Sequence, residues 1–446
     1  MPGPTAYFDP SRSGELDAAT RALVERRSRA MGSAYRLFYE HPLELVRGEG
    51  TRVWDAQGRE YLDAYNNVPS VGHAHPRVAA AMAEQAARLT THTRYLAEPT
   101  VAYAEELLST LPATIDNVMF TCTGSEANDL ALRIAKGWVS TGSTSMSGST
   151  SMSGSASMSG STGMSGPASM SGAAGVIVTA NAYHGVTTEI AAISPSLGGL
   201  DSIAEWVRVV PVAGDFGASV AAAIADLQRS GIRPAVLIVD TVFASDGAWP
   251  DVDGLVDAVA AIRHAGGLFI ADEVQPGFGR LGHGMWGFER YGIEPDIVTV
   301  GKPMGNGQPI AAVMTRHELV DAFNARSRYF NTFGGSSVSI AAAQATLDVL
   351  RDERLIDNAR DVGAYLLAEL AGSGLFEEVR GAGLFLGARL ESEERALGAV
   401  NALRERGVLI ATSGPENDTL KIRPPLPFSR ADADRLLTEL DGALGR

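Results

Sequence analysis

Short apolar runs alternate with helical stretches along much of this chain. The runs cover residues 118–122, 175–179, 235–239, 268–271 and 297–300. Continuous apolar character over four or five residues is typical of strands buried on both faces of a sheet. Helical patterns such as 255–265 lie between some of them. The alternation indicates βαβ units, so we expect the α/β class, with a mostly parallel sheet flanked by helices.

The length of the chain, 446 residues, predicts more than one core. We expect residues 61–325 to form the large domain that carries the sheet. From about residue 337 the pattern becomes helical and then gives short strands near 383–389 and 420–423. We therefore expect a smaller α+β domain over 326–446, to which the N-terminal segment 1–60 contributes.

Residues 143–172 differ from the rest of the sequence. They are five hexapeptides in tandem, each with one methionine among small polar residues. One methionine in six residues buries too little apolar surface to offset the entropy lost on ordering. We interpret the repeat as a surface loop between a helix and a strand, without a catalytic role.

Composition disfavours several partners. The net charge of −15 repels phosphate backbones, so we expect no nucleic-acid partner. We find no run of about 18 apolar residues and no secretory signal pattern, so we expect no membrane segment. The chain has one cysteine, Cys122, which fits a reducing cytoplasm, and we expect a cytoplasmic protein.

Three polar features follow predicted strands, at the edge where α/β sheets bind ligands. The first is the turn 123–128, where the start of a helix and the Ser125 hydroxyl offer an anion cradle. An ordinary capping box explains this turn equally well. The others are Asp272, which closes a buried strand, and Lys302, which follows one among glycines. A lysine in such a place is costly unless it is paired or covalently used.

Together these features match one cofactor. A lysine amine forms an imine with an aldehyde, and a carboxylate keeps a pyridine nitrogen protonated. A helix start holds a phosphate group. We therefore predict pyridoxal 5'-phosphate as the cofactor, joined to Lys302 and paired with Asp272, and we predict no metal.

In addition, the chain resembles the class III aminotransferase family of pyridoxal-phosphate fold type I. The motifs that carry the resemblance are residues 72–76, 123–128, 183–185, 272–275, Lys302 and 332–335. The resemblance implies that Gly124 and Ser125 bind the cofactor phosphate, that Tyr183 stacks on the ring and that Gln275 lies near the ring oxygen. It also implies that Thr332 reaches the cofactor of a neighbouring subunit, so that the active unit is a homodimer.

Within this family, several segments are similar to the ethanolamine-phosphate phospho-lyases, including 65–68, 93–96, 128–133, 302–307 and 329–335. Such an enzyme eliminates phosphate and ammonia from a phosphorylated amine, leaves an aldehyde, and needs a cationic pocket. The candidates for that pocket are Arg36, Arg94 and Arg423. Each could instead be a surface or ion-paired residue, and for Arg94 that interpretation is equally good. In aminotransferase relatives an arginine at the place of Arg423 grips a carboxylate. An omega-aminotransferase that passes the amine to a keto acid is therefore the alternative, and a non-catalytic cofactor-binding protein is disfavoured by Lys302 and Asp272 together.

Overall fold

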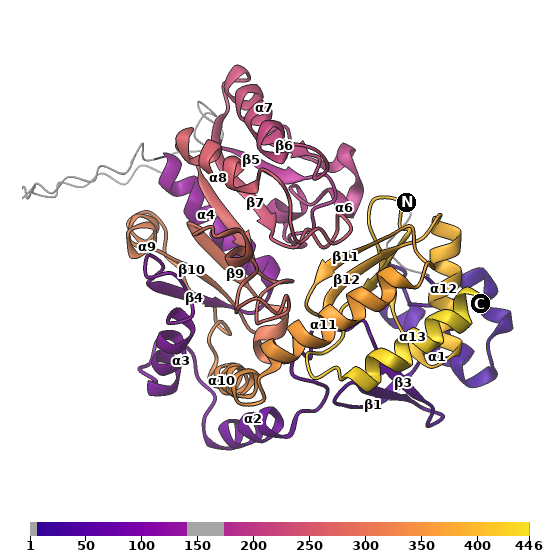
Figure 1. Ribbon diagram of the computed structural model, residues 1–446. Coiled ribbons are helices and arrows are strands. Elements are labelled where there is room, and N and C mark those ends of the chain that lie inside the picture. Colours follow the sequence, from indigo (N-terminus) through magenta and orange to yellow (C-terminus); the bar gives the residue numbers. More distant parts are fainter. Residues whose placement is uncertain (1–6, 141–173, 446) are drawn as a thin grey trace, which may run out of the picture.

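A seven-stranded sheet forms the centre of the computed structural model, which describes residues 7–140 and 174–445 (Figure 1). The strand order is β4-β10-β9-β8-β7-β5-β6. The strands are β4 (Asn117–Thr121), β5 (Ala174–Thr179), β6 (Val207–Val210), β7 (Arg233–Asp240), β8 (Leu268–Asp272), β9 (Ile297–Val300) and β10 (Ala311–Thr315). Only β10 runs against its neighbours, because it pairs antiparallel with both β4 and β9. The expected mostly parallel sheet is confirmed.

Helices cover both faces of this sheet, which explains why its central strands are mostly apolar on both faces. Leu237 of β7 packs in the cluster that includes α7 (Phe216–Arg229) and α8 (Leu255–His264). Its neighbours Val236 and Ile238 pack in a second cluster with α4 (Gly124–Ser140) and α9 (His317–Asn324). Successive side chains of a strand point to opposite faces, so each face of the sheet has its own core. The repeat 143–172 falls between α4 and β5, outside the described residues.

Two further sheets, each of four strands, lie on the right of Figure 1. One contains β1 (Leu45–Glu49), β2 (Arg52–Asp55), β3 (Glu60–Asp63) and β13 (Val408–Leu409). The other contains β11 (Glu378–Ala382), β12 (Phe385–Arg389), β15 (Thr419–Ile422) and β14 (Ala411–Ser413). Because β13 pairs with β3, the N-terminal segment and the C-terminal region share one sheet. This pairing supports our proposal that both ends of the chain build the small domain.

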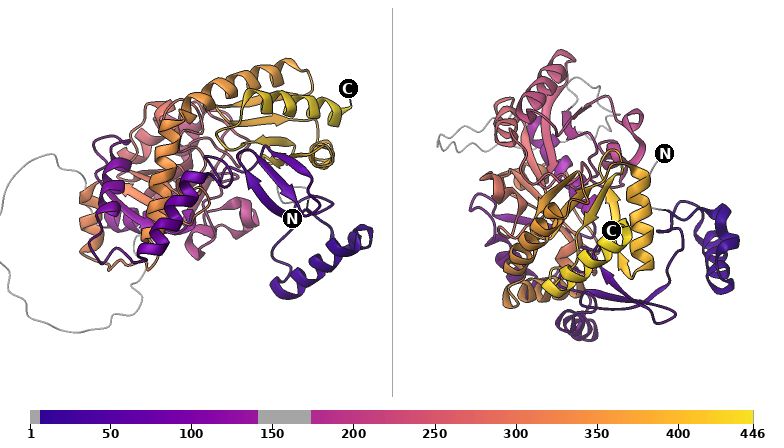
Figure 2. Two further views of the ribbon diagram at one scale, coloured as in Figure 1. Left: turned by 90° about the horizontal axis from the view of Figure 1, so that it is seen from below. Right: turned by 45° about the vertical axis from the view of Figure 1, so that its right-hand side comes forward.

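The remaining helices lie around the three sheets. They are α1 (Ala18–Met31), α2 (Pro76–Arg88), α3 (Glu98–Leu108), α5 (Thr188–Ala191), α6 (Pro195–Gly198), α10 (Ser337–Asp352), α11 (Leu355–Gly372), α12 (Glu393–Glu405) and α13 (Arg430–Leu444). Figure 2 shows that α1 stands at the periphery, and none of its residues is buried. Among residues 7–140 and 174–445, no helix combines the length and apolarity needed to cross a membrane.

Candidate active site

A cavity of about 200 Å³ lies where β7, β8 and β9 end and α4 begins. Its lining contains six of the residues singled out from the sequence, together with five others. The predicted residues are Gly124, Ser125, Tyr183, Asp272, Gln275 and Lys302. The others are Asn128, His184, Gly185, Asp240 and Val274. The strand ends thus bring the predicted lysine, carboxylate and helix start into one cavity.

Asp272 is the last residue of β8 and is 3% exposed. Its Oδ2 accepts hydrogen bonds from Asn128 Nδ2 at 2.9 Å and from His184 Nδ1 at 2.7 Å. Its Oδ1 accepts one from the Val274 N–H at 3.1 Å. Asn128 is held in turn by the Thr299 hydroxyl, which donates to its Oδ1 at 2.6 Å. The carboxylate is therefore fixed on three sides.

Lys302 follows the end of β9 and begins a short 3-10 helix, Lys302–Gly305. Burial lowers the pKa of the Lys302 amine to about 8, and the nearby Arg423 lowers this pKa further, against the opposing effect of Asp272 and Asp240. No described residue accepts a hydrogen bond from this amine. A lowered pKa leaves more of the amine neutral near pH 8, which is the form that reacts with an aldehyde.

The start of α4 is both capped and open to the cavity. Thr123 and Glu126 form a reciprocal cap, in which Glu126 Oε2 accepts from the Thr123 N–H at 2.9 Å and the Thr123 hydroxyl accepts from the Glu126 N–H at 3.2 Å. The Ser125 hydroxyl accepts from the Val186 N–H at 3.1 Å. The capping box and the anion cradle are therefore compatible, because Thr123 makes the cap while Gly124 and Ser125 line the cavity.

Glycine keeps this cradle open. Gly185 has φ +135°, and a Cβ atom there would lie 2.4 Å from the Ser125 hydroxyl oxygen. A Cβ atom on Gly301 would lie 3.2 Å from the Gly124 backbone nitrogen. A side chain at position 185 would collide with Ser125, and one at position 301 would crowd the Gly124 N–H group that a phosphate needs.

Of the three predicted arginines, Arg423 lies beside the cavity, because it contacts Gln275 of its lining. Arg423 is buried, and its Nη1 donates to Gln275 Oε1 at 2.7 Å. Arg36 is exposed and lines a different cavity of about 370 Å³. Arg94 is also exposed, with its guanidinium 3.6 Å from the centre of the Phe330 ring. Thr332 is exposed as well and does not line the Lys302 cavity.

Asp240, Asn128 and His184 were missed in the sequence. Asp240 closes β7 directly beside Asp272 of β8, and burial, followed by the charge of Asp272, raises the pKa of Asp240 to about 7. Asn128 and His184 stand inside two of the quoted motifs, so the motifs marked their segments, but nothing local showed that both side chains hold Asp272. The Nε2 atom of His184 is buried and has no partner on the described residues.

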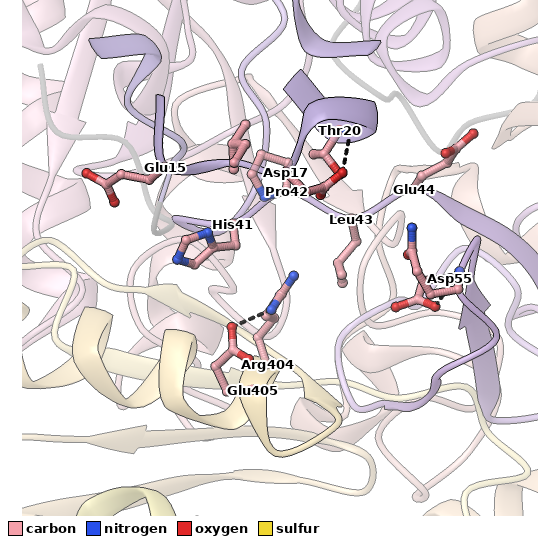
Figure 3. Close-up of a pocket in the computed structure, with 12 residues that line it drawn as sticks. Glu15, Asp17, Thr20, His41, Pro42, Leu43, Glu44, Asp55, Arg404 and Glu405 are labelled. Carbon is pink, nitrogen blue, oxygen red and sulfur yellow. Dashed lines mark hydrogen bonds and ion pairs between the residues drawn. The ribbon is translucent and has the colours of Figure 1, made fainter. Parts of the chain in front are cut away.

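A second, separate pocket of about 300 Å³ lies between the N-terminal segment and α12 (Figure 3). Its lining is rich in acidic side chains, and it shares no residue with the Lys302 cavity. The acidic residues of this lining are Glu15, Asp17, Glu44, Asp55 and Glu405. Over the described parts of the chain, no three His, Cys, Asp or Glu side chains are arranged to hold a metal ion.

Comparison with known proteins agrees with this geometry. The family model for class III aminotransferases matches residues 38–444. The chain is 35% identical to the alanine–glyoxylate aminotransferase 2-like protein of Drosophila melanogaster, over 93% of this chain and 85% of that one. It is 32% identical to ethanolamine-phosphate phospho-lyase homolog 1 of Caenorhabditis elegans, over 95% and 93%.

A solved structure of a phospholyase from Arthrobacter in complex with phosphoethanolamine is 39% identical, with a TM-score of 0.85. The match covers 95% of this chain and 99% of that one. Pyridoxal phosphate is the cofactor of the matching family. These matches confirm the resemblance inferred from the motifs: the chain belongs to the class III aminotransferase family, with the pyridoxal-phosphate-dependent fold type I.

Proposed function

We propose that this protein is a phospho-lyase acting on ethanolamine phosphate or a related phosphorylated amine. It eliminates phosphate, and one water molecule then hydrolyses the remaining enamine to ammonia and an aldehyde. The observation that carries the proposal is the near full-length similarity to the phospholyase with phosphoethanolamine. The buried guanidinium of Arg423 beside the Lys302 cavity supports it, because a phosphorylated substrate needs a cation there.

The groups around the cavity fit pyridoxal phosphate. In our proposal Lys302 bonds its aldehyde carbon, Gly124 and Ser125 hold its phosphate, Tyr183 stacks on its ring, Asp272 pairs with its pyridine nitrogen, and Gln275 lies near its ring oxygen. Tyr183 is 41% exposed, so its ring has a free face. When bound, the cofactor supplies an electron sink for the pair released at the substrate carbon.

Two residues of the large domain move or hold protons in this scheme. Once the substrate amine has taken its place, the Lys302 amine removes the proton from the amine-bearing carbon. A pKa of about 8 suits a base that works near neutral pH. Asp272 keeps the pyridine nitrogen protonated, and its bonds from Asn128 and His184 fix the direction of the carboxylate.

The substrate phosphate stands on the carbon next to the reacting one, and its departure needs positive charge nearby. Arg423 is the candidate within the same chain. Arg36 and Arg94 remain candidates if a second subunit covers their surfaces, and we propose a homodimer in which Thr332 reaches the partner's cofactor. The high exposure of Phe333, 70%, beside Thr332 favours an interface at this place.

An omega-aminotransferase is the second candidate, favoured by the 35% identity to the Drosophila protein named as alanine–glyoxylate aminotransferase 2-like. The two reactions differ in whether an amino acceptor is consumed. Purified enzyme incubated with ethanolamine phosphate and no keto acid should release phosphate and ammonia in equal amounts over many turnovers. Turnover that begins only when pyruvate is added, without phosphate release, would identify an aminotransferase instead.

A further inference from the structure

The glycine-rich segment 277–282 follows β8 and has no part in the scheme above. Its spacing, G-x-G-x-x-G, is that of dinucleotide-binding loops that open a helix, but these residues form turns and do not line the Lys302 cavity. They pack instead against the connection between β11 and β12. The Leu384 N–H donates to the Arg280 carbonyl at 3.0 Å, and a Cβ atom on Gly383 would lie 2.5 Å from that carbonyl oxygen. The segment therefore joins the central sheet to the sheet that contains β15.

Arg280, in the middle of this segment, carries a buried positive charge without a carboxylate bonded to it. The residue is 2% exposed, and it forms no ion pair within the described residues 7–140 and 174–445. Its Nη1 donates to the Leu384 carbonyl at 3.2 Å and to the Pro424 carbonyl, and its buried Nη2 has no partner on that part of the chain. An arginine stays protonated in proteins, and a buried unpaired charge costs more stability than an apolar side chain of similar volume. What this guanidinium provides is a fixed position for two backbone carbonyl groups.

Arg423 lies at the strand end that Arg280 holds. Pro424 is the next residue, so the bond from Arg280 fixes the chain directly after Arg423. The Arg423 N–H donates to the Ala64 carbonyl at 2.9 Å, which fixes the chain before it. Burial lowers the pKa of the Arg280 guanidinium, and the charge of Arg423 lowers it further, against the opposing effect of Asp63. The backbone of Arg423 is therefore held on both sides, with a second positive charge nearby.

The side chain of Arg423 is held by the same loop after β8. Its Nη1 donates to Gln275 Oε1 at 2.7 Å, and this oxygen also accepts from Asn67 Nδ2 at 2.8 Å, which fixes the orientation of the amide. The Arg423 guanidinium lies 4.4 Å from the centre of the Tyr65 ring, and its buried Nε has no partner on the described residues. Within the described chain Arg423 thus meets a neutral amide and a ring. A small displacement of its strand end would therefore change where its charge points.

We propose that Arg280 is a positioning residue for substrate binding, because it holds the strand end that carries Arg423 beside the Lys302 cavity. The inference rests on the proposed function, in which Arg423 contacts the anionic group of the substrate. Arg280 itself does not line that cavity, so it acts through Arg423. A guanidinium suits this task, because its planar fork of donors holds two acceptors in fixed directions, whereas an ammonium is a point charge. Displacing a group that orients a substrate by about 1 Å is enough to slow a reaction by up to about a hundredfold.

The test is a double-mutant cycle on the holoenzyme with saturating cofactor, made of Arg280→Met, Arg423→Met and both together. The quantities measured are KM and kcat for ethanolamine phosphate and the Kd of inorganic phosphate by calorimetry. Arg280→Met should raise KM and Kd about tenfold and leave kcat within about twofold of wild type, because Lys302 and Asp272 are untouched. In the Arg423→Met background the same change should alter kcat/KM and Kd by less than about twofold, because the group that Arg280 positions is absent.

Arg380→Met is the matched control. Arg380 of β11 also connects its sheet to the central sheet, because its Nη2 donates to the Gly247 carbonyl, in the loop after β7, at 3.1 Å. Its charge is paired with Glu378. Its loss should leave KM close to wild type. Arg280→Lys keeps the charge and a donor without the fork, so its KM should fall between those of wild type and Arg280→Met.

Melting temperature and cofactor absorbance report whether each variant is folded and loaded, and Arg280→Gln replaces Arg280→Met should that variant fail to fold. An unchanged KM and Kd in the folded variant would overturn the inference. An equal rise in KM for Arg380→Met, or a full tenfold loss in the Arg423→Met background, would also overturn it, because either result describes general docking of the two sheets. Wild type that releases no phosphate from ethanolamine phosphate, with a non-additive cycle in Kd, would overturn the lyase and leave the role of Arg280 standing.

Discussion

Replacing Asp272 with asparagine tests the centre of the proposed site. The carboxylate accepts on Oδ2 from Asn128 and His184 and on Oδ1 from the Val274 N–H. An asparagine side chain has one acceptor oxygen, so its NH₂ group must face a donor in either orientation. One lost hydrogen bond that leaves a buried group unsatisfied costs about 1–3 kcal/mol. Because His184 Nε2 has no partner among the described residues, the proton of this imidazole can move there, which keeps the cost toward the lower end.

The catalytic loss should be larger than the stability loss. A neutral amide cannot keep a pyridine nitrogen protonated. The cofactor ring would then accept less of the electron pair released when the proton leaves the amine-bearing carbon. We expect phosphate release to fall on the order of a thousandfold, which corresponds to about 4 kcal/mol of barrier. The melting temperature should drop modestly, and the cofactor should still bind, because Lys302 and the start of α4 are unchanged.

The matched control is Asp55→Asn. Asp55 is also a buried carboxylate at a strand end, and it accepts from the Gln57 and Arg59 N–H groups and from the Tyr61 hydroxyl at 2.9–3.0 Å. Its loss should lower the melting temperature similarly and leave turnover nearly unchanged. Near-normal phosphate release by loaded Asp272→Asn would refute the reasoning, as would an equal rate loss in both variants.

Three further predictions follow from the same structure. Borohydride reduction and peptide mapping of the holoenzyme should label Lys302, and Lys302→Ala should lose turnover; label on another lysine would contradict the assignment. Deleting residues 143–172 should leave melting temperature and activity nearly unchanged, and loss of either would show that the repeat packs. Folding lowers the pKa of Lys421, a residue of β15, from 10.5 to about 7. The free energy of unfolding therefore decreases as the pH falls from 10.5 to about 7, because the unfolded chain takes up a proton that the folded chain does not. Thermal melts should therefore show Lys421→Met gaining stability over wild type at pH 6 and much less at pH 10; an equal difference at both would refute the depressed pKa.

The sequence was sufficient for the features set by local strand geometry. A strand buried on both faces is apolar throughout, and parallel strands end at one edge, so Asp272 and Lys302 had to lie close together. The structure places both in one cavity with Gly124 and Ser125. Such an inference needs only the ends of the strands and the direction in which they run.

The features that sequence reasoning missed depend on contacts between distant segments. His184 belongs to a visible motif, but only the folded chain shows that its Nδ1 reaches Asp272. Arg36 and Arg94 were chosen by resemblance alone, and within one chain both are exposed.

Cofactor binding and substrate selection are assigned to different parts of the chain. In our proposal the groups that hold the cofactor, Lys302 and Asp272, stand at the end of the central sheet. The cation proposed to select the substrate, Arg423, directly follows the strand β15 of a different sheet. In this proposal, a substitution at Arg423 changes which anion is bound and leaves the residues that hold the cofactor unchanged. Such an arrangement explains physically how one fold serves relatives named for amine transfer and for phosphate elimination.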